Sequence, residues 1–103
     1  MLPTLEGFEV VKIEDIVRLK GNGNFTDVML ADGSKKMVCR FLKHFSDLLP
    51  DAFLRVHKSH IINLHFVKAY HKGSGGFVTM ADESTVEISP NYREEFMGRF
   101  QGG

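Results

Sequence analysis

The segment RVHKSHIIN (55–63) holds the densest group of side chains that could do chemistry. Arg55, His57, Lys58 and His60 place cationic and hydrogen-bonding groups within six residues, with aliphatic residues among them. Such a group could bind an anion. Its two histidines could also bind a metal ion, and a histidine beside the single cysteine of the chain could activate a nucleophile.

The spacing of these residues argues against a metal site and against an enzyme. His57 and His60 are three apart in a strand-like region, where odd spacing points side chains to opposite faces. Cys39 lies in an apolar strand segment, where we expect a small buried core residue. The run 21–23 has two glycines but precedes a strand, so it predicts a hairpin turn and not a dinucleotide-binding loop. We therefore predict no catalytic residue, no metal and no cofactor.

Length and composition are those of one soluble globular domain spanning residues 1–103. Hydrophobic residues make up 43% and charged residues 25% of the 103 positions. No apolar run approaches the roughly 20 residues that span a bilayer. The N-terminal segment does not resemble a signal peptide, and one cysteine fits a reducing compartment. We expect a cytoplasmic protein that does not enter the membrane.

The net charge is zero, but the charges are unevenly distributed. Residues 1–34 carry three basic and six acidic side chains, residues 35–72 eight and two, and residues 73–103 two and five. All five histidines also lie in the basic middle third. Because a surface field depends on local clustering and not on the total, this distribution is compatible with a nucleic-acid partner. The alternative is a chance fluctuation on a solvated surface.

The elements that must position these groups are mostly short strands. Segments rich in β-forming residues alternate with turns at 21–24, 32–33, 72–76 and 82–84. The expected strands are 8–13, 16–20, 25–31, 36–40, 54–56, 60–62, 67–71, 77–81 and 85–88.

Two short helices complete the prediction. Apolar residues recur at helical spacing over 41–49, and Pro50 ends that helix. Ser89 and Pro90 are typical of the N-cap and first residue of a final helix. That helix has one aromatic stripe, formed by Tyr92, Phe96 and Phe100. We predict a mainly β, antiparallel fold of about eight to ten strands and two helices, with no internal repeat.

The segment FLRVHKSHIINLHFVKAY (53–70) resembles the core signature of the LytTR family of bacterial DNA-binding domains. In that family an Arg-x-His-Arg-Ser segment is followed by an aromatic-Ile-Val-Asn segment. Further blocks match in the same order, and the resemblance covers about residues 8–98. These blocks are Asp15-Ile16, Gly-Asn-Phe-Thr at 23–26, Asp32-Gly33, the 41–49 helix and Ser89.

The resemblance implies an elongated antiparallel β fold that docks loops into successive major grooves of double-stranded DNA. Such domains usually form the C-terminal output part of two-component response regulators. It therefore implies transcriptional regulation, with a receiver domain N-terminal in a longer protein or in a separate chain. A dimer on repeated half-sites would fit the same role.

The resemblance also implies which residues meet DNA. Base contacts are expected from Asn24, Lys58 and Asn91, because lysine can donate to guanine and asparagine can pair with adenine. Contacts that hold phosphate or position the domain are expected from Arg40, His57, Ser59 and Arg93. Two departures from the family stand out: Lys58 replaces the commoner arginine, and Pro90-Asn91 stand where basic residues are usual.

Some roles stay open on the sequence alone. His57 could brace its loop through the backbone instead of touching phosphate, and Lys58 could contact phosphate only. Asn63 is expected to cap a turn. An alternative function is a small β module whose basic surface binds an acidic protein partner; DNA mobility at two salt concentrations would distinguish the two.

Overall fold

The computed structural model describes residues 2–4, 7–73 and 75–101, and shows an elongated molecule of 41 × 24 × 21 Å. Ten strands and two α-helices lie within these residues, which confirms the predicted mainly β antiparallel class. The strands are β1 (Leu2–Thr4), β2 (Gly7–Glu9), β3 (Ile16–Asn22), β4 (Phe25–Leu30), β5 (Lys35–Val38), β6 (Phe53–His57), β7 (His60–Asn63), β8 (Val67–His71), β9 (Phe77–Met80) and β10 (Thr85–Glu87). The helices are α1 (Leu42–Leu48) and α2 (Pro90–Gln101).

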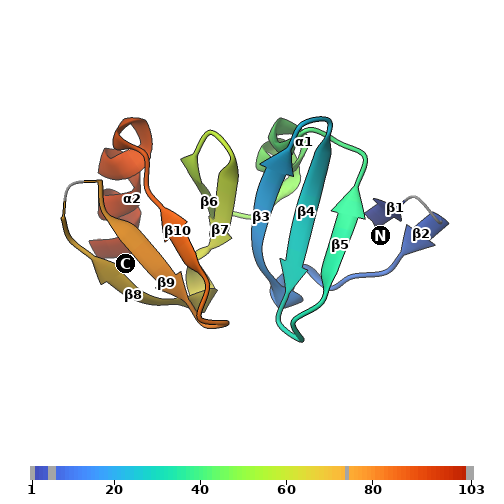
Figure 1. Ribbon diagram of the computed structural model, residues 1–103, viewed down its shortest axis with the longest axis horizontal. Helices are drawn as coiled ribbons and strands as arrows, with labels where there is room; N and C mark the ends of the chain where they lie inside the picture. Colours follow the sequence, from blue (N-terminus) through green and yellow to red (C-terminus); the bar gives the residue numbers. More distant parts are fainter. Residues whose placement is uncertain (1, 5–6, 74, 102–103) are drawn as a thin grey trace.

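The strands form three antiparallel sheets that follow one another along the molecule (Figure 1). The central sheet has the order β5-β4-β3-β7-β6, and the second has the order β10-β9-β8. The strands β1 and β2 pair at one end. No helix in the described part of the chain is long and apolar enough to cross a membrane.

Two hydrophobic cores hold the sheets and helices together, and the β6–β7 hairpin contributes to both. Ile61 packs with the core that α1 covers, whose helix residues are Leu42 and Phe45. Its neighbour Ile62 packs on the other face, in the core that contains Phe96 of α2. Consecutive residues of a strand point to opposite faces, so one short strand can fill two cores.

The two larger sheets are built from the same succession of elements, although the sequence predicted no repeat. A single-turn 3₁₀ helix, η1 (Ile13–Asp15), leads to β3, β4, β5 and then α1. A second, η2 (Leu64–Phe66), leads in the same way to β8, β9, β10 and α2. In the β3–β4 hairpin the register shifts between the first and third residues of β3, Ile16 and Arg18. In the β8–β9 hairpin it shifts between the first and third residues of β8, Val67 and Ala69.

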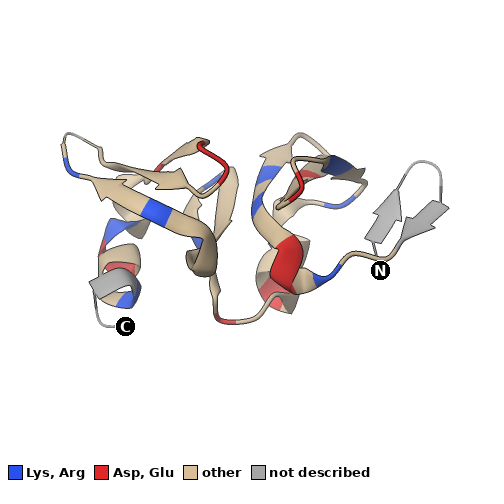
Figure 2. Cartoon of the chain, turned by 90° about the horizontal axis from the view of Figure 1, so that it is seen from below, with Lys and Arg blue, Asp and Glu red and all other residues tan. Residues whose placement is uncertain are grey.

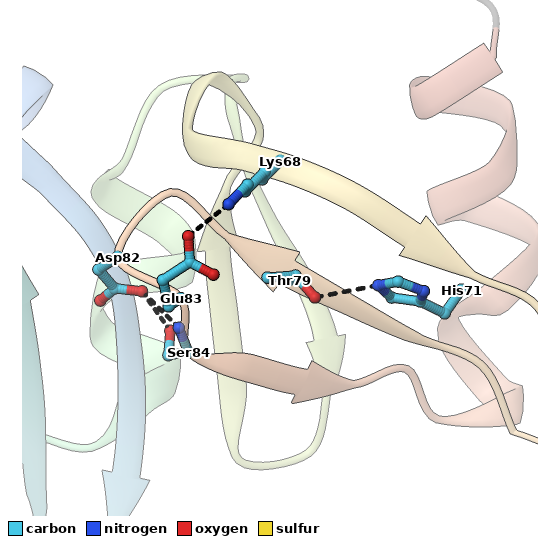
Figure 3. Close-up of polar contacts among 6 residues, drawn as sticks. All are labelled: Lys68, His71, Thr79, Asp82, Glu83 and Ser84. Atoms are coloured by element: carbon cyan, nitrogen blue, oxygen red, sulfur yellow. Dashed lines mark hydrogen bonds and ion pairs between the residues drawn. The ribbon is translucent and has the colours of Figure 1, made fainter.

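Matching turns support this repeat. The turns 31–34 (ADGS) and 81–84 (ADES) each have an aspartate carboxylate that accepts the serine N–H, at 2.8 and 2.9 Å. The third residue of each has a positive φ, +89° for Gly33 and +72° for Glu83. Figure 3 shows the second turn, in which Glu83 also pairs with Lys68. In the sequence the repeat also shows as KGNGNF (20–25) and KGSGGF (72–77).

The structure corrects three sequence predictions. The segment 8–13 is not one strand, because β2 ends at Glu9 and η1 begins at Ile13. Cys39 is exposed, since β5 ends one residue earlier, so it is no core residue and its replacement by alanine opens no cavity. The helix at 41–49 buries Leu42 and Phe45, but Phe41 is exposed.

Other predictions agree with the structure. The strand 67–71 has the predicted bounds, and the final helix begins at Pro90. Phe96 of the aromatic stripe is buried and Tyr92 is half-buried, whereas the side chain of Phe100 lies outside the described residues.

Asn63 caps a turn, as predicted. It is 2% exposed, its Oδ1 accepts the N–H of His65 (3.0 Å), and its Nδ2 donates to the carbonyl of Ile16 (2.9 Å). The side chain therefore joins the start of η2 to the start of β3.

We predict that Asn63→Ala destabilises the domain by about 2–3 kcal/mol, because it leaves two backbone groups without their partners. Urea denaturation measures the change. The exposed Asn22→Ala is the matched control and should stay within about 0.5 kcal/mol of the parent. Equal effects of the two substitutions would contradict the prediction.

Candidate nucleic-acid interface

Three tips of the fold lie along the upper edge of the molecule in Figure 1: the β3–β4 turn, the β6–β7 turn and the start of α2. Each tip carries one of the predicted base-contacting residues, Asn24, Lys58 and Asn91 in that order. All three side chains are exposed. The fold thus brings together residues that lie up to 67 positions apart in the chain.

Backbone hydrogen bonds fix the spacing of the tips. The N–H of Gly21, near the end of β3, donates to the carbonyl of Ser59 in the β6–β7 turn (2.8 Å). The N–H of Ser89, just before α2, donates to the carbonyl of Val56 in β6 (2.8 Å). Both bonds involve the β6–β7 hairpin, which therefore holds the other two tips in place.

The β6–β7 tip is braced from within. His57 Nδ1 accepts the backbone N–H of Ser59 (3.1 Å), which is the bracing role that the sequence left open. The guanidinium of Arg55 donates to the carbonyls of His57 (3.3 Å, from Nε) and Lys58. Two side chains of β6 thus hold the backbone of the turn, so the exposed Lys58 side chain extends from a fixed backbone.

The two histidines of this hairpin lie together, contrary to the sequence prediction. His57 and His60 are paired across β6 and β7, and their ring centroids are 5.1 Å apart. The rule of opposite faces applies within one strand, whereas a two-residue turn separates these residues. No group of three or more histidine, cysteine or acidic side chains within the described ranges is arranged to hold a metal ion.

The predicted phosphate-contacting residues differ in exposure. Arg40 is exposed between β5 and α1, and its carbonyl accepts the hydroxyl of Thr26 (2.8 Å). Ser59 and His57 are half-buried. Arg93 is also half-buried, and its Nε is buried without a hydrogen-bond partner among the described residues. Its Nη2 lies beside Gly76, so the side chain lies against the second sheet.

Sequence reasoning assigned no role to Arg55, although it braces the central tip. A signal was present, because Arg55 stands between the buried Leu54 and Val56 in a strand. An arginine flanked by core residues must place its charge at the strand end, where turn carbonyls can accept its hydrogen bonds.

Acidic side chains gather at the opposite, lower edge. Glu14 and Asp15 lie in η1, and the 31–34 and 81–84 turns lie at the lower ends of their sheets (Figure 1). Figure 2, seen from below, shows acidic segments in η1 and in the β9–β10 turn. Hydrogen bonds from Ser34 lower the pKa of Asp32 and so favour its charge. Basic side chains accompany these acids, since Lys68 pairs with Glu83 and the charge of Lys36 acts on Asp32, so the lower edge carries charges of both signs.

One side chain of the central hairpin is electrostatically unusual. The pKa of His60 is lowered to about 4, mainly by burial and also by the charges of the nearby His57, Arg18 and Lys20. Its Nδ1 is buried without a hydrogen-bond partner in the described structure. The folded domain therefore favours the neutral imidazole at this position.

We predict that stability falls as the pH is lowered from about 6.5 to about 4. In this window the unfolded chain binds a proton at His60 and the folded domain does not, so protonation favours unfolding. Urea denaturation across this range, with His60→Phe beside the exposed His65→Phe, tests the assignment. The stability of His60→Phe should fall less over this pH range than that of the parent, whereas the stability of His65→Phe should fall by the same amount. Parallel curves for both variants would exclude His60 as the source.

Comparisons with known proteins agree with this geometry. Over 85 residues, 82% of its length, the chain is 29% identical to the CO-responsive transcriptional regulator RcoM of Rhodospirillum rubrum. The chain spans only 36% of that relative. A solved structure, the LytTr DNA-binding domain of a putative methyl-accepting/DNA response regulator from Bacillus cereus, matches with a TM-score of 0.84 and 26% identity. The match covers 99% of this chain and 94% of that one.

The family model of the LytTr DNA-binding domain matches residues 6–101, nearly the whole chain. Together with the shared fold and the row of tips, this match shows that the chain belongs to the LytTr DNA-binding domain family.

Proposed function

We propose that this domain binds double-stranded DNA in a sequence-specific way and serves as the output part of a transcriptional regulator. The observation that carries the proposal is the row of three exposed tips on one edge, fixed by backbone hydrogen bonds. The molecule is 41 Å long, and successive major grooves on one face of B-DNA recur about every 34–36 Å. The longest dimension of the molecule is thus comparable with the spacing of two successive grooves, and the row of tips occupies part of it (Figure 1).

In this proposal the exposed tip residues read bases. Asn24 and Asn91 can each pair with adenine through two hydrogen bonds, and Lys58 can donate to guanine. Arg40, Ser59 and Arg93 would contact phosphate or position the domain. His57 would act mainly by holding the turn, because its Nδ1 already accepts the N–H of Ser59.

The wider setting follows from the relatives. The Rhodospirillum protein is a transcriptional regulator in which the matched region is about a third of the length, and the Bacillus domain belongs to a putative response regulator. We infer that this domain acts with a sensing or receiver domain, in the same chain or in a separate one, in the bacterial cytoplasm. Two copies on repeated half-sites would increase affinity, and the domain would bind without catalysis or a cofactor.

We predict binding with a steep dependence on salt. About four to seven basic groups lie near the upper edge, and each neutralised phosphate contributes roughly −0.9 to the slope of log affinity against log salt. The expected slope is about −4 to −6, measured by titrating a labelled duplex at several salt concentrations. A slope near zero, or no binding to any duplex, would exclude the proposal. Salt-sensitive binding to an acidic protein alone would favour the interaction-module alternative.

We predict that Lys58 reads sequence and that Arg40 mainly supplies affinity. Lys58 extends from the braced central tip, whereas Arg40 precedes a helix at the side of the edge. Lys58→Ala should cost about 1–3 kcal/mol on a site selected from random duplexes and little on a scrambled duplex, whereas Arg40→Ala should weaken both about equally.

Both variants are compared with the parent at one salt concentration. An equal loss on the two duplexes for Lys58→Ala would make Lys58 a phosphate contact instead.

A further inference from the structure

Phe41 stands out among the apolar residues of the chain. It is 63% exposed and directly precedes α1, whose core-facing residues are Leu42 and Phe45. It also occupies the N-cap position of that helix and makes no side-chain capping hydrogen bond. Serine, threonine, asparagine and aspartate are preferred there, because their side chains accept a free N–H of the first turn. Phe41 therefore contributes neither to the core nor to the cap.

Its surroundings place Phe41 between two of the candidate DNA-contacting tips. One hollow beside it is also lined by Gly23, Lys58 and Ser59. A second hollow, on its other side, is lined by Asn24 and Arg40. Phe41 and Lys43 line both hollows, so they form the ridge that separates them.

This ridge has a fixed backbone. The N–H of Arg40 donates to the carbonyl of Val38 (2.9 Å), and the N–H of His44 donates to the carbonyl of Phe41 (3.0 Å). On the other side, α1 packs closely on β3: a Cβ added at Gly21 would lie 3.4 Å from the Cβ of Leu42. Because its backbone is already held by these contacts, Phe41 can contact a partner without the entropic cost of ordering this segment on binding.

The charges around Phe41 indicate what kind of partner fits. Arg40, Lys43 and His44 are exposed around it, and among the residues lining the two hollows Asp47 is the acidic one. A partner that matches this surface has an apolar group surrounded by negative charge. The thymine methyl in the major groove, flanked by backbone phosphates, has these properties.

We infer that Phe41 is a further specificity-determining residue, which contacts a thymine methyl group while Lys43 contacts a neighbouring phosphate. The inference rests on the proposed DNA-binding function and adds to it an apolar contact between the β3–β4 and β6–β7 tips. Leu48, at the far end of α1, is similarly exposed at 66% but lines neither hollow, which makes it the matched control.

The decisive variant is Phe41→Ser, because it restores a capping residue. The substitution should leave the urea midpoint unchanged or raise it, while it lowers affinity for the selected site about tenfold and leaves the salt slope unchanged. Lys43→Ala should weaken selected and scrambled duplexes alike and make the salt slope shallower by about 1. Leu48→Ser should change neither affinity nor slope.

Replacing each thymine of the selected site by uracil, one at a time, identifies the contact. At one position the replacement should weaken binding of the parent domain and have no further effect on Phe41→Ser, since the methyl group has then lost its partner. Unchanged affinity of Phe41→Ser, or the absence of such a position, overturns the inference. Failure of the parent domain to bind any duplex would instead overturn the proposed function, so the two failures are distinguishable.

Discussion

The β6–β7 hairpin is the element on which the rest of the structure depends. Val56 and Ile62 are fully buried in one core, and Ile61 is buried in the other. The hairpin also carries Lys58 in its turn, and its backbone carbonyls accept the hydrogen bonds that place the other two tips. Aliphatic and cationic residues are interleaved because a strand pair must fill two cores and still end in an exposed turn. The same pattern of residues therefore has to satisfy two requirements, which are filling the two cores and exposing the turn.

In the proposed function, this arrangement would let a β fold present two turns and the start of one helix to DNA. Turns at strand ends have few packing contacts of their own, so their geometry must be set from outside. Here the geometry is set by backbone hydrogen bonds between tips and by Arg55, which donates to the carbonyls of His57 and Lys58 at the start of the central turn. The two repeated units place their acidic turns at the lower edge, away from the tips. A neutral domain can thus present one edge suited to a polyanion.

Local patterns in the sequence predicted the strands from β3 onward, the turns and the capping role of Asn63, because alternation, glycine and asparagine have effects within a few residues. Three features depend on chain pairing and could not be predicted in this way. Cys39 sits in an apolar context but follows the end of β5. His57 and His60 meet because a turn lies between them. The internal repeat leaves only the short matches at 20–25 and 72–77 and at 31–34 and 81–84 in the sequence, and the rest of it depends on strand register and on helix order.

Two residues that break local rules lie near the upper edge. Phe41 stands where a capping residue is preferred, and His60 is held neutral beside other cations. Phe41 lies on the upper edge and His60 in the hairpin that forms its central tip, and the lower edge has its own exception in Glu83, whose φ is +72°. When local preference and global fold agree elsewhere in a chain, local conflicts point to selection for something other than stability. Phe41 and His60 lie beside the row of tips, which is the edge that the proposed function assigns to DNA.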